Sequence, residues 1–184
     1  MHALNLDETW RQRQPYQPYF CEENVWQLLQ AEGLPQPRAA VFVTNATRTV
    51  AMWGQRAGRP DPVVWDYHVV LLLPKEGLIL DLDDRVQLVW PVRDWLGHAF
   101  RADQFDLQPR FRIVDGEEFL AKFSSDRSHM RDARKRPVQP FPDWPAPFDP
   151  ARGMNLMRFV DLEDAIAGVV VDADQMAHAS QRGI

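Results

Sequence analysis

The sequence contains a single cysteine, Cys21, among its 184 residues. One cysteine cannot form an internal disulfide, so the composition does not call for an oxidising compartment. No hydrophobic run approaches the roughly 20 apolar residues of a membrane-spanning helix, and residues 1–8 lack the apolar core of a secretory signal peptide. We therefore expect a cytoplasmic protein that is soluble and has no membrane partner.

Positive charge is also in short supply. The chain has 21 Lys and Arg against 26 Asp and Glu, a net charge of −5, and its only basic cluster is the short stretch 131–136. Nucleic acid is therefore a poor prediction for a partner. Internal repeats and glycine-rich phosphate loops are absent too. The ordinary share of hydrophobic residues, 45%, and the length predict one catalytic domain over residues 1–184, which we expect to be a monomer.

The segment around the cysteine has the spacing of a helix over about residues 21–31. Its apolar residues recur at helical intervals: Cys21, Val25, Leu28 and Leu29. Backbone N–H groups at a helix start can lower a thiol pKa from about 8.5 to roughly 3.5–7.5 when a histidine assists. Glu22 and Glu23 oppose a thiolate, so a cationic partner would be needed. On spacing alone, a small buried hydrophobe is the commoner role for such a cysteine.

The rest of the chain predicts an antiparallel sheet with a few helices. Residues 1–18 are polar and predict an extended N-terminal arm, and six prolines in residues 137–150 predict an extended surface connector. We expect residues 124–130 to be a plain surface loop. Strands are predicted over residues 39–44, 49–53, 63–73, 78–83 and 111–114, and helices over 91–99 and 116–123. The first two strands should form a hairpin, and so should the third and fourth.

The hairpin of strands 63–73 and 78–83 carries the polar residues of interest. By strand alternation, Asp66 and His68 share one face, and Asp81 and Asp83 share one face of the neighbouring strand. This arrangement would bring a carboxylate beside His68. Taken singly, the histidine is more often a hydrogen-bonded core residue, and the aspartates more often an acidic strand end facing water. Cross-strand neighbours meet more readily than residues of one strand, which disfavours Asp66 as the partner.

A histidine and an aspartate on adjacent strands, downstream of a cysteine at a helix start, are typical of a cysteine hydrolase. They supply a nucleophile, a base and a group that orients the base. A metal site is the alternative, but one histidine with crowded aspartates lacks the ligand spacing of a zinc site. The sequence therefore predicts no metal.

Five blocks of sequence, in order from Phe20 to about Phe159, resemble the protein N-terminal glutamine amidohydrolase family. The blocks are Phe20–Trp26, Val64–Leu72, Asp81–Asp83, Phe123–Met130 and Met154–Leu156. The resemblance implies an α+β fold of papain-like or transglutaminase-like type. It also implies a Cys-His-Asp triad that deamidates an N-terminal glutamine. By motif, the nucleophile is Cys21, the base His68 and the orienting carboxylate Asp81.

The chemistry of such a triad can be followed without the family name. His68 would take the thiol proton, and the imidazolium would offset Glu22 and Glu23 and hold Cys21 as a thiolate. Attack on the carboxamide, loss of ammonia and hydrolysis of a thioester would follow, with no metal or organic cofactor. The backbone N–H of Cys21 is the first candidate donor to the oxyanion.

The partners predicted are proteins or peptides that begin with glutamine. Their terminal ammonium needs a carboxylate in the cleft, and the candidates in the matching blocks are Glu22, Asp66 and Asp126. Because the triad does not choose between amide types, a cysteine peptidase or acyl transferase is an alternative. A module that binds N-termini without turning them over is another.

Overall fold

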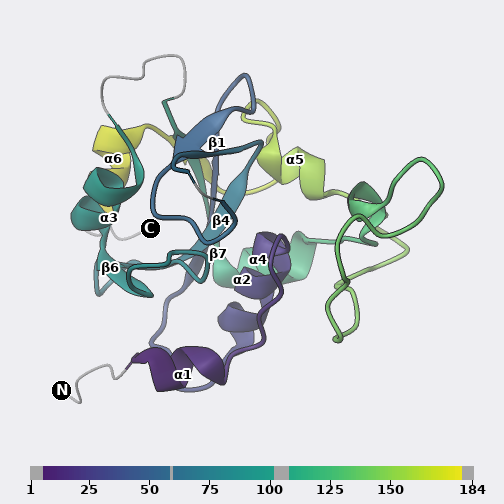
Figure 1. The fold of residues 1–184 in the computed structure, drawn as a ribbon, viewed down its shortest axis with the longest axis horizontal. Helices are drawn as coiled ribbons and strands as arrows, with labels where there is room; N and C mark the ends of the chain where they lie inside the picture. Colours follow the sequence, from purple (N-terminus) through teal and green to yellow (C-terminus); the bar gives the residue numbers. More distant parts are fainter. Residues whose placement is uncertain (1–5, 59, 102–107, 180–184) are drawn as a thin grey trace.

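A six-stranded antiparallel sheet runs through the computed structural model, which describes residues 6–58, 60–101 and 108–179 (Figure 1). The strand order is β6-β5-β4-β1-β7-β8, and β2 pairs with β3 in a separate two-stranded sheet. The strands are β1 Ala39–Thr44, β2 Val50–Met52, β3 Val63–Trp65, β4 His68–Leu73, β5 Leu78–Leu80, β6 Val89–Pro91, β7 Arg110–Asp115 and β8 Val169–Val171. The mixed α and β composition and the antiparallel sheet confirm those parts of the predicted fold class.

Helices cover both faces of the sheet. One face carries α2 (Cys21–Gln30), α4 (Gly116–Lys122) and α5 (Leu156–Val160), and the other carries α3 (Val92–Ala99) and α6 (Ala173–Ala177). Alternation along β1 explains the two layers, because successive side chains of a strand point to opposite faces. Phe42 packs in the first core and Val41 in the second, and all six residues of β1 are buried. Among the described residues, no helix combines the length and the apolar character needed to span a bilayer.

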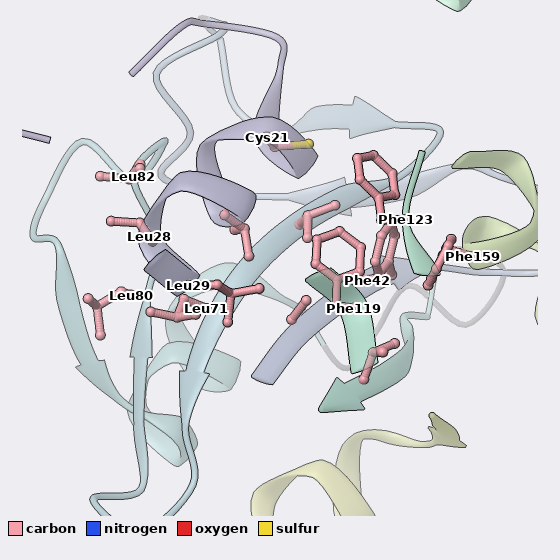
Figure 2. Close-up of a cluster of buried hydrophobic side chains, with 14 of the residues drawn as sticks. Cys21, Leu28, Leu29, Phe42, Leu71, Leu80, Leu82, Phe119, Phe123 and Phe159 are labelled. Carbon is pink, nitrogen blue, oxygen red and sulfur yellow. The ribbon is translucent and has the colours of Figure 1, made fainter. Parts of the chain in front are cut away.

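The first core fixes α2 on the sheet. Figure 2 shows leucines on one side of this core, with Leu28 of α2 close to Leu82, and aromatic side chains on the other, where Phe42 lies near Phe123. The rings of Phe42 and Phe159 stack with their centroids 5.5 Å apart. Burial of a side chain of this size stabilises the fold by roughly 1.5–3 kcal/mol. The start of α2, where Cys21 lies, is therefore held by packing further along the same helix.

The end of α2 is closed by an arginine. Gly33 has a φ of +80°, a left-handed conformation that side-chain-bearing residues rarely adopt, and it turns the chain away from the helix. The guanidinium of the buried Arg38 donates to the carbonyl oxygens of Leu28 and Leu29 and to two carbonyls of the following turn. These bonds satisfy acceptors that a helix end leaves unpaired. Both ends of the predicted helix are therefore confirmed within about one residue.

The predicted hairpin of residues 39–44 and 49–53 is wrong. Both edges of β1 are already occupied, by β4 and by β7, so β1 has no edge left for β2. The side chain of Asn45 shapes the turn by accepting from the backbone N–H groups of Thr47 and Thr49. This turn directs the chain onto β3, with which β2 pairs instead.

The single strand predicted over residues 63–73 is divided into β3 and β4. Oδ1 of Asp66 accepts from the backbone N–H of Tyr67 at 2.9 Å, and Oγ1 of Thr44 donates to the Asp66 carbonyl oxygen at 2.8 Å. These bonds take the backbone of Asp66 out of the strand ladder. The prediction that Asp66 and His68 share a strand face is therefore wrong, because Asp66 is exposed between the strands whereas His68 is buried at the start of β4.

The predicted hairpin of the third and fourth strands is confirmed, although β5 is shorter than expected. β4 and β5 pair antiparallel from Leu71 opposite Leu80 to Leu73 opposite Leu78. The chain then turns at Asp81, whose Oδ1 accepts from the backbone N–H of Asp83 at 3.0 Å. The two aspartates therefore belong to a turn, and the argument from strand alternation does not apply to them.

The predicted extended arm over residues 1–18 is interrupted by a helix, α1 (Glu8–Gln12). Asp7 caps this helix by accepting from the backbone N–H of Trp10 at 2.8 Å. Trp10 is buried against the first core, so the arm packs on the protein. Residues 1–5 of the predicted arm lie outside the described residues.

A second buried arginine ties α5 to the sheet. Arg112 of β7 donates to the carbonyl oxygens of Phe159 at 3.0 Å, Asp161 at 2.6 Å, Asp164 at 2.7 Å and Ala167 at 2.7 Å. Burial lowers the pKa of Arg112 below its ordinary value. These four acceptors lie in the segment from the end of α5 to β8, which places that segment over the sheet.

We expect Arg112→Met to destabilise the protein by about 3 kcal/mol or more, because it leaves several buried carbonyl groups without a donor. Arg110→Met, at an exposed position of the same strand, should change stability by less than about 0.5 kcal/mol. Urea unfolding of both variants followed by circular dichroism measures the difference. Equal losses would contradict a specific role for the Arg112 hydrogen bonds.

Candidate active site

Cys21 is the first residue of α2 and lines a cavity of about 210 Å³. The residue is 8% exposed, and a hydrogen bond from the backbone of Val69 in β4 acts to lower the pKa of its thiol. Phe20, which precedes the helix, makes no side-chain cap, so the N–H groups of the first turn face the start of the helix uncovered by a capping oxygen. In Figure 2 the sulfur of Cys21 lies at the upper end of the helix, above the labelled leucines.

His68 and Asp81 lie side by side. Nε2 of His68 is 2.9 Å from Oδ1 of Asp81, and both side chains are at most 1% exposed. Because an ionised carboxylate can only accept, Nε2 carries a proton and Nδ1 is the ring nitrogen left for other contacts. His68 also lines the same cavity as Cys21. The predicted meeting of a carboxylate with His68 is confirmed; the catalytic roles of the three residues stay predictions.

Asp81 is held by further donors from two other segments and from its own turn. Nε2 of Gln55 donates to its Oδ2 at 3.2 Å, Nε1 of Trp95 lies 3.5 Å from the same oxygen, and the backbone N–H of Asp83 donates to Oδ1. The imidazole of His68 is fixed in turn by the indole of Trp65, stacked on it at 5.7 Å between ring centroids. The pair therefore has one orientation, set from both sides.

The Asp81 carboxylate makes His68 a stronger base. Burial opposes ionisation of Asp81, but the charge and hydrogen bond of His68 outweigh it and lower the pKa of the carboxyl below its usual value. Burial likewise opposes protonation of His68, yet the Asp81 carboxylate raises the pKa of the imidazole. Each partner stabilises the charged state of the other.

The predicted thiolate at Cys21 is not favoured by its surroundings. Burial raises the pKa of the thiol well above its ordinary value, and the carboxylates of Glu22 and Asp83 add to this effect. The hydrogen bond from the backbone of Val69 acts in the opposite direction and does not compensate. The sequence indicates that a His68 imidazolium would lower the thiol pKa, but it does not reveal how deeply the sulfur is buried, which raises that pKa.

Glu23 is neutralised by an arginine from the segment predicted to be a surface loop. Nε and Nη2 of Arg127 donate to the two carboxylate oxygens of Glu23 at 2.8 and 2.7 Å, and Nε1 of Trp144 donates to Oε2 at 2.9 Å. Arg127 is 7% exposed and Ser124 and Ser125 are fully buried, so the prediction of a plain surface loop over residues 124–130 is wrong. The segment packs against the start of α2 because a buried carboxylate there requires a cation.

Glu22 is buried beneath the cysteine without such an arginine. Its Oε2 lies 3.6 Å from Sγ of Cys21 and accepts from the hydroxyl of Tyr67 at 3.2 Å. Nε2 of His129, in the short 3₁₀ turn Ser128–Met130, lies 3.4 Å from Oε1. Among the described residues, none donates a hydrogen bond to Oε1 of Glu22. The carboxylate therefore sits next to the thiol with half of its acceptor capacity unused.

The three carboxylates predicted to meet a substrate amine are not equivalent. Asp66 lines the cavity together with Cys21 and His68. Glu22 is fully buried under the cavity wall. Asp126 is exposed, and its Oδ1 accepts from the backbone N–H of Ser128 at 2.8 Å; within the part of the chain that the structure describes, it is not one of the residues lining this cavity.

Asp83, the other candidate orienter, has a different partner. The hydroxyl of Tyr16 donates to its Oδ1 at 2.5 Å. Burial raises the pKa of Asp83 above its usual value, with the charge of Asp81 adding to the effect. His68, Asp81 and Asp83 each offer one possible ligand atom within 4.8 Å of one another. A cation there would compete with the hydrogen bonds that already hold Asp81.

Sequence reasoning missed the residues that support this site from a distance. Gln55 and Trp95 hold Asp81, Tyr16 holds Asp83, and Arg127 holds Glu23. Arg127 lies in one of the sequence blocks that carry the family resemblance, which is the one signal that could have singled it out. No spacing in the chain joins Gln55 or Trp95 to Asp81.

Comparisons with known proteins find matches over most of the chain. The sequence model of the family described as N-terminal glutamine amidase matches residues 16–180. Protein N-terminal glutamine amidohydrolase of Bos taurus is 33% identical over 177 residues, which cover 89% of this chain and 85% of that protein. The human protein of the same name is 32% identical over 89% of this chain and 86% of its own length, and that of Drosophila grimshawi is 38% identical over 71% and 70%. The chain therefore belongs to the N-terminal glutamine amidase family.

Proposed function

We propose that this protein hydrolyses the side-chain amide of an N-terminal glutamine, releasing ammonia and leaving glutamate, by a Cys-His-Asp mechanism with a thioester intermediate. The observation that carries the proposal is the pairing of His68 with Asp81 at the wall of the cavity that Cys21 also lines. The names of the relatives support the substrate. The papain-like or transglutaminase-like type of the fold is part of the same proposal, supported by a cysteine at a helix start packed on an antiparallel sheet.

In the first half of the reaction, the proton of Cys21 passes to Nδ1 of His68 and the sulfur attacks the carboxamide carbon. The carbonyl oxygen becomes an oxyanion, and the backbone N–H of Cys21, at the uncapped start of α2, is the donor we assign to it. His68 then gives its proton to the amide nitrogen, the C–N bond breaks and ammonia leaves. The product is a thioester between Cys21 and the side chain of the substrate.

In the second half, a water molecule replaces ammonia. His68, again neutral at Nδ1, takes a proton from the water as it attacks the thioester, and then returns it to the departing sulfur. The C–S bond breaks, and a glutamate side chain and the Cys21 thiol result. Asp81 accepts from Nε2 throughout, which keeps the imidazole in the tautomer whose Nδ1 faces the reaction.

Asp66 is the carboxylate we assign to the terminal ammonium of the substrate. It is exposed at the cavity wall, so a cation can reach it without displacing a buried partner. Glu22 is fully buried, and its Oε1 already lies 3.4 Å from Nε2 of His129. An amine held at a fixed place also sets the length of side chain that reaches the sulfur.

The proposed activity predicts a sharp substrate pattern. Peptides that begin with Gln should release ammonia, N-acetylated or internal Gln should not, and N-terminal Asn should react on the order of 10²-fold more slowly because its carbonyl stops about 1 Å short.

Cys21→Ala should abolish turnover with the circular dichroism spectrum unchanged. An enzyme-coupled ammonia assay measures all of these. Peptide fragments in place of ammonia would indicate a peptidase, and ammonia release by Cys21→Ala would refute the nucleophile.

The two buried aspartates near His68 provide a matched test of the orienter. Asp81→Asn should lower kcat on the order of 10⁴-fold, the loss known for an amide at this position of a serine-protease triad, because it favours the wrong imidazole tautomer. Asp83→Asn removes the same charge from a group bonded to Tyr16 and should cost far less. Steady-state kinetics on a Gln peptide decide between them, and equal losses would leave Asp81 without a special role.

Asp66→Asn should raise KM for a Gln peptide on the order of tenfold, the loss of one hydrogen bond to a charged group, while kcat changes little. Glu76→Gln is the matched control, because Glu76 is exposed in the turn at the far end of β4 from His68. If Asp66→Asn left KM at the wild-type value, the amine would have to bind elsewhere.

A further inference from the structure

The carboxylate of Glu22 is a strong local charge that the proposed reaction does not use. It is fully buried, its Oε2 lies 3.6 Å from the sulfur of Cys21, and its Oε1 receives no hydrogen bond from the described residues. Its neighbour Glu23 is not in the same position, because Arg127 and Trp144 bond both of its oxygens. Glu23 is therefore paired with an arginine, whereas Glu22 has the thiol beside Oε2 and Nε2 of His129 at 3.4 Å from Oε1.

A buried negative charge this close to a nucleophile opposes the step that the nucleophile must undergo. Two unit charges a few ångströms apart in a partly buried site interact by more than one pK unit, so a carboxylate beside Sγ disfavours the thiolate. The pKa of Cys21 is raised by burial first and by Glu22 next, in agreement with the geometry. Burying the Glu22 carboxylate costs free energy, so an uncharged side chain at this position would serve stability better.

We propose that Glu22 keeps Cys21 protonated in the absence of substrate, and that the terminal ammonium of a bound N-terminus offsets this charge and allows the thiol to react. The inference rests on the proposed function and adds a second reason for a free N-terminus. Glu22 acts through Cys21 and does not touch the carboxamide, so it is a positioning residue and not a catalytic one.

The shape of the site supports this coupling. Cys21 and Asp66 both belong to the wall of one cavity of about 210 Å³. An ammonium held at Asp66 would therefore enter the cavity that the thiol lines, where charges are less screened than in bulk water. The other titratable groups that face Cys21 and Glu22 come from three segments and are Tyr67, His68, Asp83 and His129.

An acetylated N-terminus brings no positive charge. Such a peptide would leave the thiol in its protonated form even when the peptide occupies the cavity. Discrimination against blocked N-termini would then arise in the chemical step as well as in binding. Internal glutamines would be protected from deamidation by the same means.

The experiment follows the rate of Cys21 alkylation by iodoacetamide as a function of pH. Ala-Gly amide supplies a free ammonium with a side chain too short to cover the sulfur, and N-acetyl-Ala-Gly amide is the neutral control. We expect Ala-Gly amide to lower the midpoint of the alkylation profile by about one pH unit, a roughly tenfold faster reaction below the midpoint. The acetylated peptide should leave the midpoint unchanged, since steric shielding lowers the rate at every pH.

Variants separate Glu22 from a general effect of surface charge. Glu22→Gln should lower the midpoint by about one unit without any peptide, and Glu76→Gln should not move it. An unchanged midpoint in Glu22→Gln overturns the proposal, and so does an unchanged midpoint of the wild-type protein at saturating Ala-Gly amide. If Glu22→Gln does not fold, the peptide measurements on the wild-type protein decide. Ammonia release from a Gln peptide by the same preparation distinguishes failure of this inference from failure of the proposed function.

Discussion

The contact between the first residue of α2 and the start of β4 is the interaction on which the site depends. Cys21 begins the helix and His68 begins the strand, so two residues 47 positions apart line one cavity from the ends of rigid elements. The backbone of Val69, the second residue of β4, acts to lower the pKa of the Cys21 thiol. The aliphatic and aromatic core beneath α2 holds this contact in place (Figure 2). A site made from element ends gains its precision from the packing of whole elements.

The second constraint is the handling of buried negative charge. Glu23, Asp81 and Asp83 are each almost fully buried, and each has donors from a different part of the chain: an arginine and an indole, a histidine and an amide, and a tyrosine. Carboxylates out of water are costly unless they are paired and hydrogen-bonded. Much of the fold around the site, including the segment of Arg127, is therefore explained by the needs of these groups. Glu22 differs from them because, among the described residues, its charged neighbour is a histidine, His129, at 3.4 Å from Oε1, and no hydrogen bond reaches that oxygen.

Local patterns were enough to predict the helix at Cys21 and the hairpin that brings Asp81 to His68. They failed where a side chain competes with a strand for backbone groups, as Asp66 does, because strand alternation assumes an unbroken ladder. They also failed at Arg127, whose polar surroundings in sequence look like surface while its partner, Glu23, lies 104 residues away. Pairings over such distances leave no periodicity to read. The family resemblance supplied the choice of Asp81 over Asp83, which spacing alone could not make.

The proline-rich segment over residues 137–150 has a consequence for how Arg127 is accommodated. Proline has no backbone N–H, so a segment with six prolines offers carbonyl oxygens with few competing donors. Arg127 donates to the carbonyls of Pro142 and Trp144, and the backbone N–H of Ser125 donates to that of Pro147. This stretch therefore presents backbone carbonyl acceptors to the Arg127 guanidinium, which can only donate. Proline both restricts the backbone of the stretch and leaves it with more acceptors than donors.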